Sequence, residues 1–228
     1  MKTPLLSRGK VRKVIGHVLR NRSIQLLLTD RRPKRYLNLG CGGNILDDYI
    51  NLDYTWSRGV DLCWDVKRGI PLASNSLEGI FTEHTLEHFT WQEALRVFLP
   101  ECFRVLRPGG TLRISVPDAE LSVIAYEEAR RSGATGRSFH AAYDGGDRIP
   151  MTPMMHLNNT FRRIYEPLEK GHKFVYDFHT LEYFLHWVGF TSVTKESFMR
   201  GRSPKLLVDY EKRASESLYV EALKPNRN

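Results

Sequence analysis

Cysteine is scarce in this sequence, and the three that occur, Cys41, Cys63 and Cys102, lie far apart. They predict neither a disulfide framework nor a paired Cys-x-x-Cys metal site. No apolar run approaches the ~18 residues of a membrane-spanning helix, and Arg20 and Arg22 interrupt the stretch that a secretory leader would need. These absences favour a protein of the reducing cytoplasm.

Acidic residues are almost missing from the first part of the chain. Residues 1–35 contain eleven Lys and Arg against Asp30 alone, a net charge of +10. Since the whole chain has a net charge of +8, the remaining residues have a net charge of −2. A high pI often indicates nucleic-acid binding. Here the basic charge belongs to an arm and not to the body, which argues against a nucleic acid bound across the catalytic face.

The basic arm also has the spacing of an amphipathic helix. Val11, Val14, Ile15, Val18 and Leu19 follow one helical face. Such a helix can lie on an anionic membrane through residues 1–30, or it can pack on its own domain. Both interpretations stay open, and so does a location at the inner face of the membrane.

The most informative stretch runs from Arg35 to Asp53. It reads as an apolar strand, a glycine cluster at positions 40, 42 and 43, and a second strand that ends on Asp53. Glycines at such a turn let a ligand approach the main chain, and the carboxylate can accept from ribose hydroxyls. The pattern predicts a nucleoside cofactor. A nicotinamide dehydrogenase is disfavoured because the third glycine of Gly-x-Gly-x-x-Gly is missing and Asp53 follows early.

Apolar periodicity along the rest of the chain predicts an open α/β sheet. Residues 45–49 leave room for only a brief turn, so we expect a truncated first helix. Pro100 should kink or divide the helix that contains it, and Arg113 is expected at an edge or pointing outward. Strands are predicted at 60–66, 77–82, 111–117, 191–198 and 217–223, and helices at 91–106, 121–131 and 180–188.

Residues 132–170 lose regular periodicity. They contain Gly133, Gly136 and the pair Thr152-Pro153, yet Met154 and Phe161 argue against disorder. A long irregular insertion in a compact domain is usually functional, so we interpret it as a lid. The predicted organisation is a basic arm at 1–34 and one domain at 35–228 with the lid inserted at about 132–170.

Five motifs occur in a fixed order: Leu-Asn-Leu-Gly-Cys-Gly from Leu37, Asn-Leu-Asp from Asn51, the segment 64–72, His-Thr-Leu-Glu-His from His84, and the segment 104–118. Together they resemble class I S-adenosylmethionine-dependent methyltransferases. The resemblance is greatest to a small bacterial branch often associated with surface-glycan modification. It implies a Rossmann-like, mostly parallel sheet whose last strand, 217–223, is antiparallel.

The resemblance also implies S-adenosyl-L-methionine as cofactor and assigns residues to it. Gly40 and Gly42 would lie near the methionine portion, and Asp53 would hold the ribose. Asp65 and Val66 would contact the adenine. The predicted cofactor-binding set is completed by flanking residues: Asn38, Leu39, Cys41, Thr82 and Glu83.

Catalysis of methyl transfer needs mainly orientation and a dry pocket, because the sulfonium carries the activated group. A hydroxyl acceptor would also need a base, and histidine titrates nearest to working pH. His84, after the fourth strand, is the first candidate, with a packing role as its alternative. His172 is a further candidate. Asp118 suits an acceptor hydroxyl or, equally, the cap of the next helix.

Polar residues in and after the lid suit a sugar or another small polar acceptor, with a solvated loop as the alternative for those inside the lid. The predicted acceptor contacts are His156, Asn158, Lys173 and Tyr176.

His84 to His88 also match His-x-x-Glu-His, the inverted zinc-protease pattern. That hypothesis needs a helix at this point and a third ligand. Because the segment follows a strand within a series of cofactor motifs, we predict no metal and interpret Glu87 and His88 as groups that fix the turn.

The sequence thus predicts an S-adenosylmethionine-dependent methyltransferase that acts on a hydroxyl of a sugar or small polar acceptor. The alternatives are a lipid-linked or secondary-metabolite acceptor at a membrane, and a catalytically inactive binding protein that keeps the fold. Acceptor identity and oligomeric state are not encoded in any motif.

Overall fold

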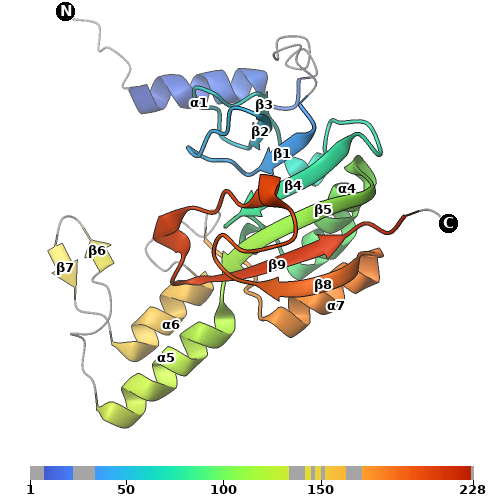
Figure 1. The fold of residues 1–228 in the computed structure, drawn as a ribbon. Coiled ribbons are helices and arrows are strands. Elements are labelled where there is room, and N and C mark those ends of the chain that lie inside the picture. The colour runs from blue at the N-terminus through green and yellow to red at the C-terminus, as the bar shows by residue number, and fades with distance from the viewer. Residues whose placement is uncertain are drawn as a thin grey trace, which may run out of the picture.

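The computed structural model describes residues 8–22, 34–133, 142–144, 147–149, 152–162 and 171–226. Its centre is a seven-stranded sheet in the order β3-β2-β1-β4-β5-β9-β8 (Figure 1). All neighbouring pairs are parallel except those that involve β9. The predicted Rossmann-like sheet with an antiparallel last strand is therefore confirmed. The strands are β1 (Tyr36–Leu39), β2 (Tyr49–Asp53), β3 (Leu62–Cys63), β4 (Leu77–Glu83), β5 (Leu106–Pro117), β8 (Thr191–Glu196) and β9 (Ser217–Leu223).

The strand order reverses between β1 and β4. From β1 the sheet grows through β2 to β3 on one side and through β4 and β5 on the other. Ligands of open α/β sheets bind beyond the carboxyl ends of the strands at such a reversal. The turn after Leu39 and the segment after Glu83 meet at this point, which makes it the expected site.

The link between β1 and β2 contains turns and no helix over residues 40–48. This confirms the truncated first crossover. The short link keeps Asp53 close to the glycine turn, because no helix separates the two strand ends.

The helix predicted at 91–106 is divided as expected. Helix α3 (Trp91–Glu93) begins with a capping box between Thr90 and Glu93, passes into a π-helical segment (Ala94–Phe98), and continues as α4 (Leu99–Val105). Pro100 lies in the first turn of α4, where its missing N–H matters least. The π-helical turn immediately before it absorbs the disrupted hydrogen-bond pattern.

Apolar side chains from the sheet and its helices form one main core. It includes Leu37, Leu52, Ile80, Phe98 and Leu112, all fully buried. Helix α7 (Phe178–Val188) packs below β8 and ends at Gly189, which adopts a left-handed conformation at φ 109°. Glycine reaches this conformation without strain.

Two sequence predictions about this framework are wrong. The strand predicted at 60–66 is only two residues long, because Asp65 instead accepts from Lys67 N at 3.1 Å and caps a short 3-10 helix, η1 (Val66–Arg68). Arg113 is neither exposed nor at an edge. Its side chain is 0% exposed and pairs with Asp209 at 2.6 Å and Glu221 at 3.1 Å.

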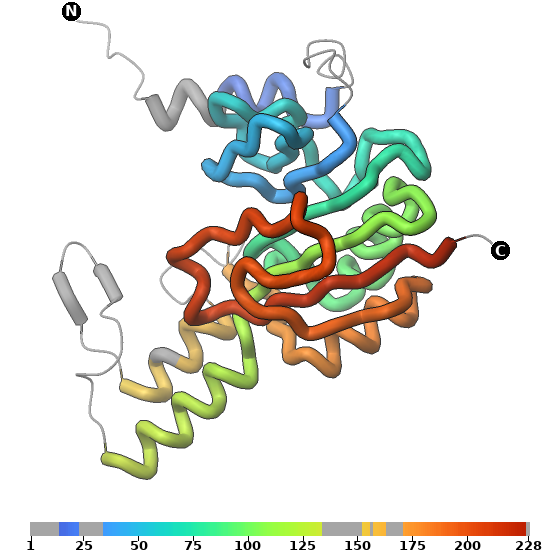
Figure 2. The backbone as a smooth tube through the Cα atoms, in the orientation of Figure 1, coloured from blue at the N-terminus to red at the C-terminus, as the bar shows by residue number. Residues whose placement is uncertain are grey.

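The predicted lid is more regular than its sequence suggests. Its described parts include the strand pair β6 (Ala142–Asp144) and β7 (Asp147–Ile149) and helix α6 (Pro153–Arg162). Helix α6 packs against α5 (Ala119–Ser132), and the two project from the sheet (Figures 1 and 2). Thr152-Pro153, interpreted above as a loop marker, begins α6, since Thr152 Oγ1 accepts from Met155 N at 3.2 Å and Pro153 stands at its first position.

Helix α1 (Arg8–Leu19) packs its carboxyl end on the domain. Asn21 N donates to Cys63 O at 3.2 Å, and Arg20 Nε donates to Tyr54 O at 3.0 Å. Val14 and Val18 are 57% and 50% exposed, whereas the Val11 side chain lies outside the described residues. No helix in the described part of the chain has the length and apolar character needed to cross a membrane.

Candidate functional site

The glycine turn after β1 is held against the end of β2 by main-chain hydrogen bonds. Gly40 N and Cys41 N donate to Leu52 O at 2.8 and 3.1 Å, and Gly42 N donates to Asp53 Oδ2 at 2.8 Å. Gly40 and Gly42 have φ values of 76° and 52°, where side chains cause strain. A Cβ on Gly40 would also overlap the Thr85 side chain. On the side that faces the end of β4, the turn is therefore packed against Thr85 and leaves no space for a ligand.

The outer side of the same turn is open. A Cβ on Gly42 or Gly43 would meet no atom within 4 Å. Asp53 lies beside this space, and its Oδ1 accepts from Thr55 N at 2.6 Å. Burial raises the pKa of Asp53, whereas the hydrogen bonds from Thr55 and Gly42 and the nearby His88 act to lower it. An open glycine turn with a carboxylate at its rim suits a nucleoside with an extended chain.

Three predicted cofactor residues serve the turn through buried side chains. Asn38 Nδ2 donates to Asn44 O at 2.7 Å and to Asn51 Oδ1 at 3.0 Å. Leu39 lies in the core, and burial raises the pKa of the Cys41 thiol. These side chains support the turn from the protein interior. They are therefore not available to contact a ligand on the open, outer side of the turn.

The predicted adenine contacts lie next to the arm. Asp65 N donates to Asn21 Oδ1 at 2.9 Å, and Val66 is buried. Asn21 adopts a left-handed φ of 62° directly after α1. The arm therefore forms one wall beside Asp65, a contact that no sequence motif indicates.

The end of β4 presents a buried and strained segment. Thr82 is 1% exposed, and Glu83 accepts from Tyr210 N at 3.0 Å while burial raises the pKa of its carboxyl. His84 has a φ of 47°, an uncommon conformation for a residue with a side chain, and such strain clusters at functional sites. Ser217 Oγ lies 2.7 Å from His84 Nε2.

Two predicted catalytic histidines meet at one carboxylate that the sequence interpretation treated as structural. Glu87 is 0% exposed, with Oε1 at 3.5 Å from His84 Nδ1 and 3.9 Å from His172 Nε2. The His88 and His172 rings lie edge to face with centroids 5.3 Å apart. Glu87, His88 and His172 offer ligand atoms within 4.8 Å of one another, whereas His84 is not part of this group. The zinc-protease motif, which needs both histidines on one helical face, is therefore not formed, because Leu86–His88 is only a short 3-10 helix, η2.

Other predicted site residues lie apart from this cluster. Asp118 Oδ1 accepts from Glu120 N at 2.9 Å and from Leu121 N at 3.2 Å, so it caps α5. Tyr176 is 0% exposed in the core, which removes it from surfaces that an acceptor reaches. Lys173 and Asn158 are exposed, and Asn158 Nδ2 donates to Met154 O at 3.0 Å. The side chain of His156 lies outside the described residues.

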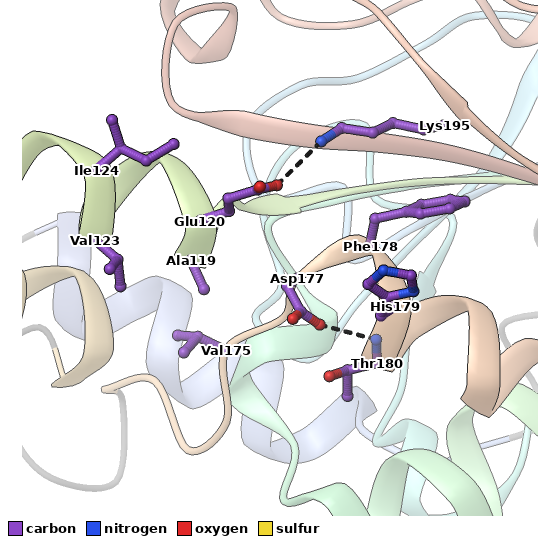
Figure 3. Close-up of a pocket in the computed structure, with 10 residues that line it drawn as sticks. All are labelled: Ala119, Glu120, Val123, Ile124, Val175, Asp177, Phe178, His179, Thr180 and Lys195. Atoms are coloured by element: carbon purple, nitrogen blue, oxygen red, sulfur yellow. Dashed lines mark hydrogen bonds and ion pairs between the residues drawn. The ribbon is translucent and has the colours of Figure 1, made fainter.

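A hollow of about 520 Å³ opens between the first turns of α5 and α7 (Figure 3). Its charged groups are paired, with Lys195 Nζ at 3.4 Å from Glu120 and Asp177 accepting from Thr180 N at 2.8 Å. None of its lining residues belongs to the predicted cofactor set. The hollow is therefore separate from the residues that the sequence predicts for the cofactor.

Comparison with known families gives one match. Residues 51–114 fit a family model described as a methyltransferase domain. The matched segment runs from the Asp53 strand through the His84–His88 segment into β5. The glycine turn lies before this segment, and His172 and Ser217 lie after it. No curated protein matches the chain.

Several solved structures are similar in fold at low identity. A possible histamine N-methyltransferase from Thermotoga maritima aligns with a TM-score of 0.46 and 14% identity over 94% of each chain. An S-adenosylmethionine-dependent methyltransferase from Mesorhizobium loti aligns with a TM-score of 0.47 and 16% identity, covering 88% of this chain and 95% of its own.

The matched segment is that of a methyltransferase domain, and the strand order and the open glycine turn agree with it. The chain is an enzyme of this class, with S-adenosylmethionine as its cofactor.

Proposed function

We propose that the chain transfers the methyl group of S-adenosylmethionine to a hydroxyl of a sugar or another small polar acceptor. The observation that carries the proposal is the contact of His84 with Glu87 at the end of β4. N-methylation of a free amine needs little base catalysis, whereas a hydroxyl must lose its proton as it attacks. A histidine oriented by a carboxylate is the usual device for that step.

The chemistry assigns each ring nitrogen of His84 a role. The Glu87 carboxylate favours a proton on Nδ1, which leaves the lone pair on Nε2, beside the Ser217 hydroxyl. An acceptor hydroxyl could take the place of the Ser217 hydroxyl beside Nε2, or reach Nε2 through a hydrogen bond to Ser217. It would lose its proton to Nε2 while its oxygen attacks the methyl carbon. Bound S-adenosylmethionine supplies the electrophilic methyl and leaves as the neutral thioether.

Replacing His84 by alanine tests this role. We expect turnover to fall by about 10²- to 10⁴-fold, with the affinity for S-adenosylmethionine unchanged, because His84 is proposed to act on the acceptor. Steady-state kinetics and calorimetric cofactor binding separate the two effects. His179→Ala is the matched control, since that histidine is exposed on α7 and lies 3.9 Å from Glu182 in an imidazole–carboxylate pair. Loss of cofactor binding in His84→Ala would show a structural role instead.

The acceptor class is tested by radiolabelled methyl transfer onto fractionated cell extract. We expect label in the small polar or glycan fraction. The exposed Val14 and Val18 on the basic helix favour a second candidate, an acceptor embedded in a membrane. Label confined to the lipid fraction would select that candidate, and label confined to nucleic acid would contradict both.

A further inference from the structure

We propose that Glu87, His88 and His172 form a binding site for one divalent transition-metal ion of the Zn²⁺ type. One ligand atom from each residue lies within 4.8 Å of those of the other two. Two imidazoles and one carboxylate are a recurrent ligand set for Zn²⁺ in enzymes, where the remaining position holds water or substrate.

The tautomers of both histidines suit metal binding. His172 Nδ1 lies 2.6 Å from Thr160 O, and His88 Nδ1 lies 3.3 Å from Gly171 O. A carbonyl oxygen only accepts, so each Nδ1 carries the proton and each neutral ring keeps its lone pair on Nε2. Histidine ligands of metals usually donate their other N–H to a backbone carbonyl in this way.

The main chain holds the three residues together although His172 is distant in sequence. Lys173 N and Phe174 N donate to Glu87 O at 2.8 and 3.3 Å. These bonds fasten the segment after His172 to η2, which contains Glu87 and His88. The site is therefore built on anchored backbone and not on a loose surface loop.

The spacing requires only a small adjustment. Ligand atoms at ~2.1 Å around a tetrahedral ion lie about 3.4 Å apart. Atoms within 4.8 Å of one another reach that spacing when the side chains move by about 1 Å, which torsional adjustments allow. Glu87 and His172 are at most 8% exposed, so a bound ion would be shielded from bulk water on that side.

The position suggests what such an ion would do. His88 lies near Asp53, and His84 contacts the same Glu87 carboxylate. An ion beside the predicted methyl-transfer site could bind the acceptor oxygen and make its hydroxyl more acidic. This role rests on the proposed function, whereas metal binding itself does not.

Titration of the metal-free full-length protein with Co²⁺ tests the site without cofactor or acceptor. We expect one Co²⁺ per chain, visible as d–d absorption and displaced by Zn²⁺. His172→Ala and His88→Ala should each weaken binding by at least about 100-fold, the upper end of what loss of an outer hydrogen-bond partner causes. His179→Ala, a surface histidine at 3.9 Å from Glu182, should bind Co²⁺ as the wild type does.

Circular dichroism verifies that each variant is folded. If His172→Ala unfolds, the partly exposed His88→Gln variant decides the question. No Co²⁺ absorption, or absorption that persists undiminished in a folded His88 or His172 variant, would overturn the proposal. The cluster would then be a metal-free imidazole–carboxylate network. Because binding is measured on its own, this result would leave the proposed methyl transfer intact.

Discussion

Replacing Asp53 by alanine is expected to abolish detectable binding of S-adenosylmethionine. The Asp53 carboxylate lies at the rim of the open turn and is the predicted partner of the ribose hydroxyls. It also accepts from Gly42 N at 2.8 Å, so its removal takes away one of the three hydrogen bonds that hold the turn against β2. Hydrogen bonds to a charged group contribute about 1.5–3 kcal/mol each. Losing two ribose contacts would therefore weaken binding by about 10²- to 10⁴-fold.

Calorimetric titration measures this loss. The matched control is Asp47→Ala, which removes an exposed carboxylate from the same link between β1 and β2. It should bind the cofactor as the wild type does. Asp53→Asn should bind weakly, since it keeps one acceptor oxygen but no charge. Wild-type affinity in Asp53→Ala would mean that the ribose does not lie at this strand end.

Replacing Arg113 by methionine is expected to lower the free energy of unfolding by about 3–5 kcal/mol, the usual cost of leaving buried charges unpaired. The guanidinium bonds Asp209 through Nε and Nη2 at 2.8 and 2.6 Å, and Glu221 through Nη1 at 3.1 Å. It also donates to the carbonyls of Arg200 and Ser197 at 2.9 and 3.1 Å. Methionine fills a similar volume, so the loss would report the charges and not a cavity.

Denaturant unfolding gives the measurement. Arg130→Met, which removes an exposed arginine from its pair with Glu127 at 3.1 Å, should leave the midpoint almost unchanged, because surface pairs contribute little. If Arg113→Met unfolded at the wild-type midpoint, the two carboxylates would have to be neutral or hydrated in the folded protein.

The sheet could be predicted because local pattern and global topology agree in it. The strand ending at Asp53 and the strand 217–223 were placed by apolar periodicity, and the short link after Gly40 required a truncated crossover. Strand β3 was overestimated because its apolar residues resemble a strand, whereas Asp65 caps a 3-10 helix. In the sequence, an aspartate that caps a helix cannot be told apart from an aspartate that ends a strand and contacts a ligand.

Arg113 and the Glu87 cluster could not be predicted because their partners are distant in sequence. Periodicity places Arg113 on a strand, yet its burial depends on two distant carboxylates, Glu221 on β9 and Asp209 in the irregular segment that precedes β9. The sequence alone indicates turn residues at Glu87 and His88, and only the folded chain brings His172 beside them. Sequence spacing identifies residue types within a motif but not the segment that folds against it.

The most direct test of the cofactor site is ultraviolet cross-linking of the full-length protein with methyl-labelled S-adenosylmethionine, followed by identification of the labelled peptide. The site described here predicts label in the glycine turn and Asp53 region, residues 40–55, or in residues 82–88, and protection by S-adenosylhomocysteine. Label that S-adenosylhomocysteine does not displace, or label confined to the hollow between α5 and α7, would contradict it.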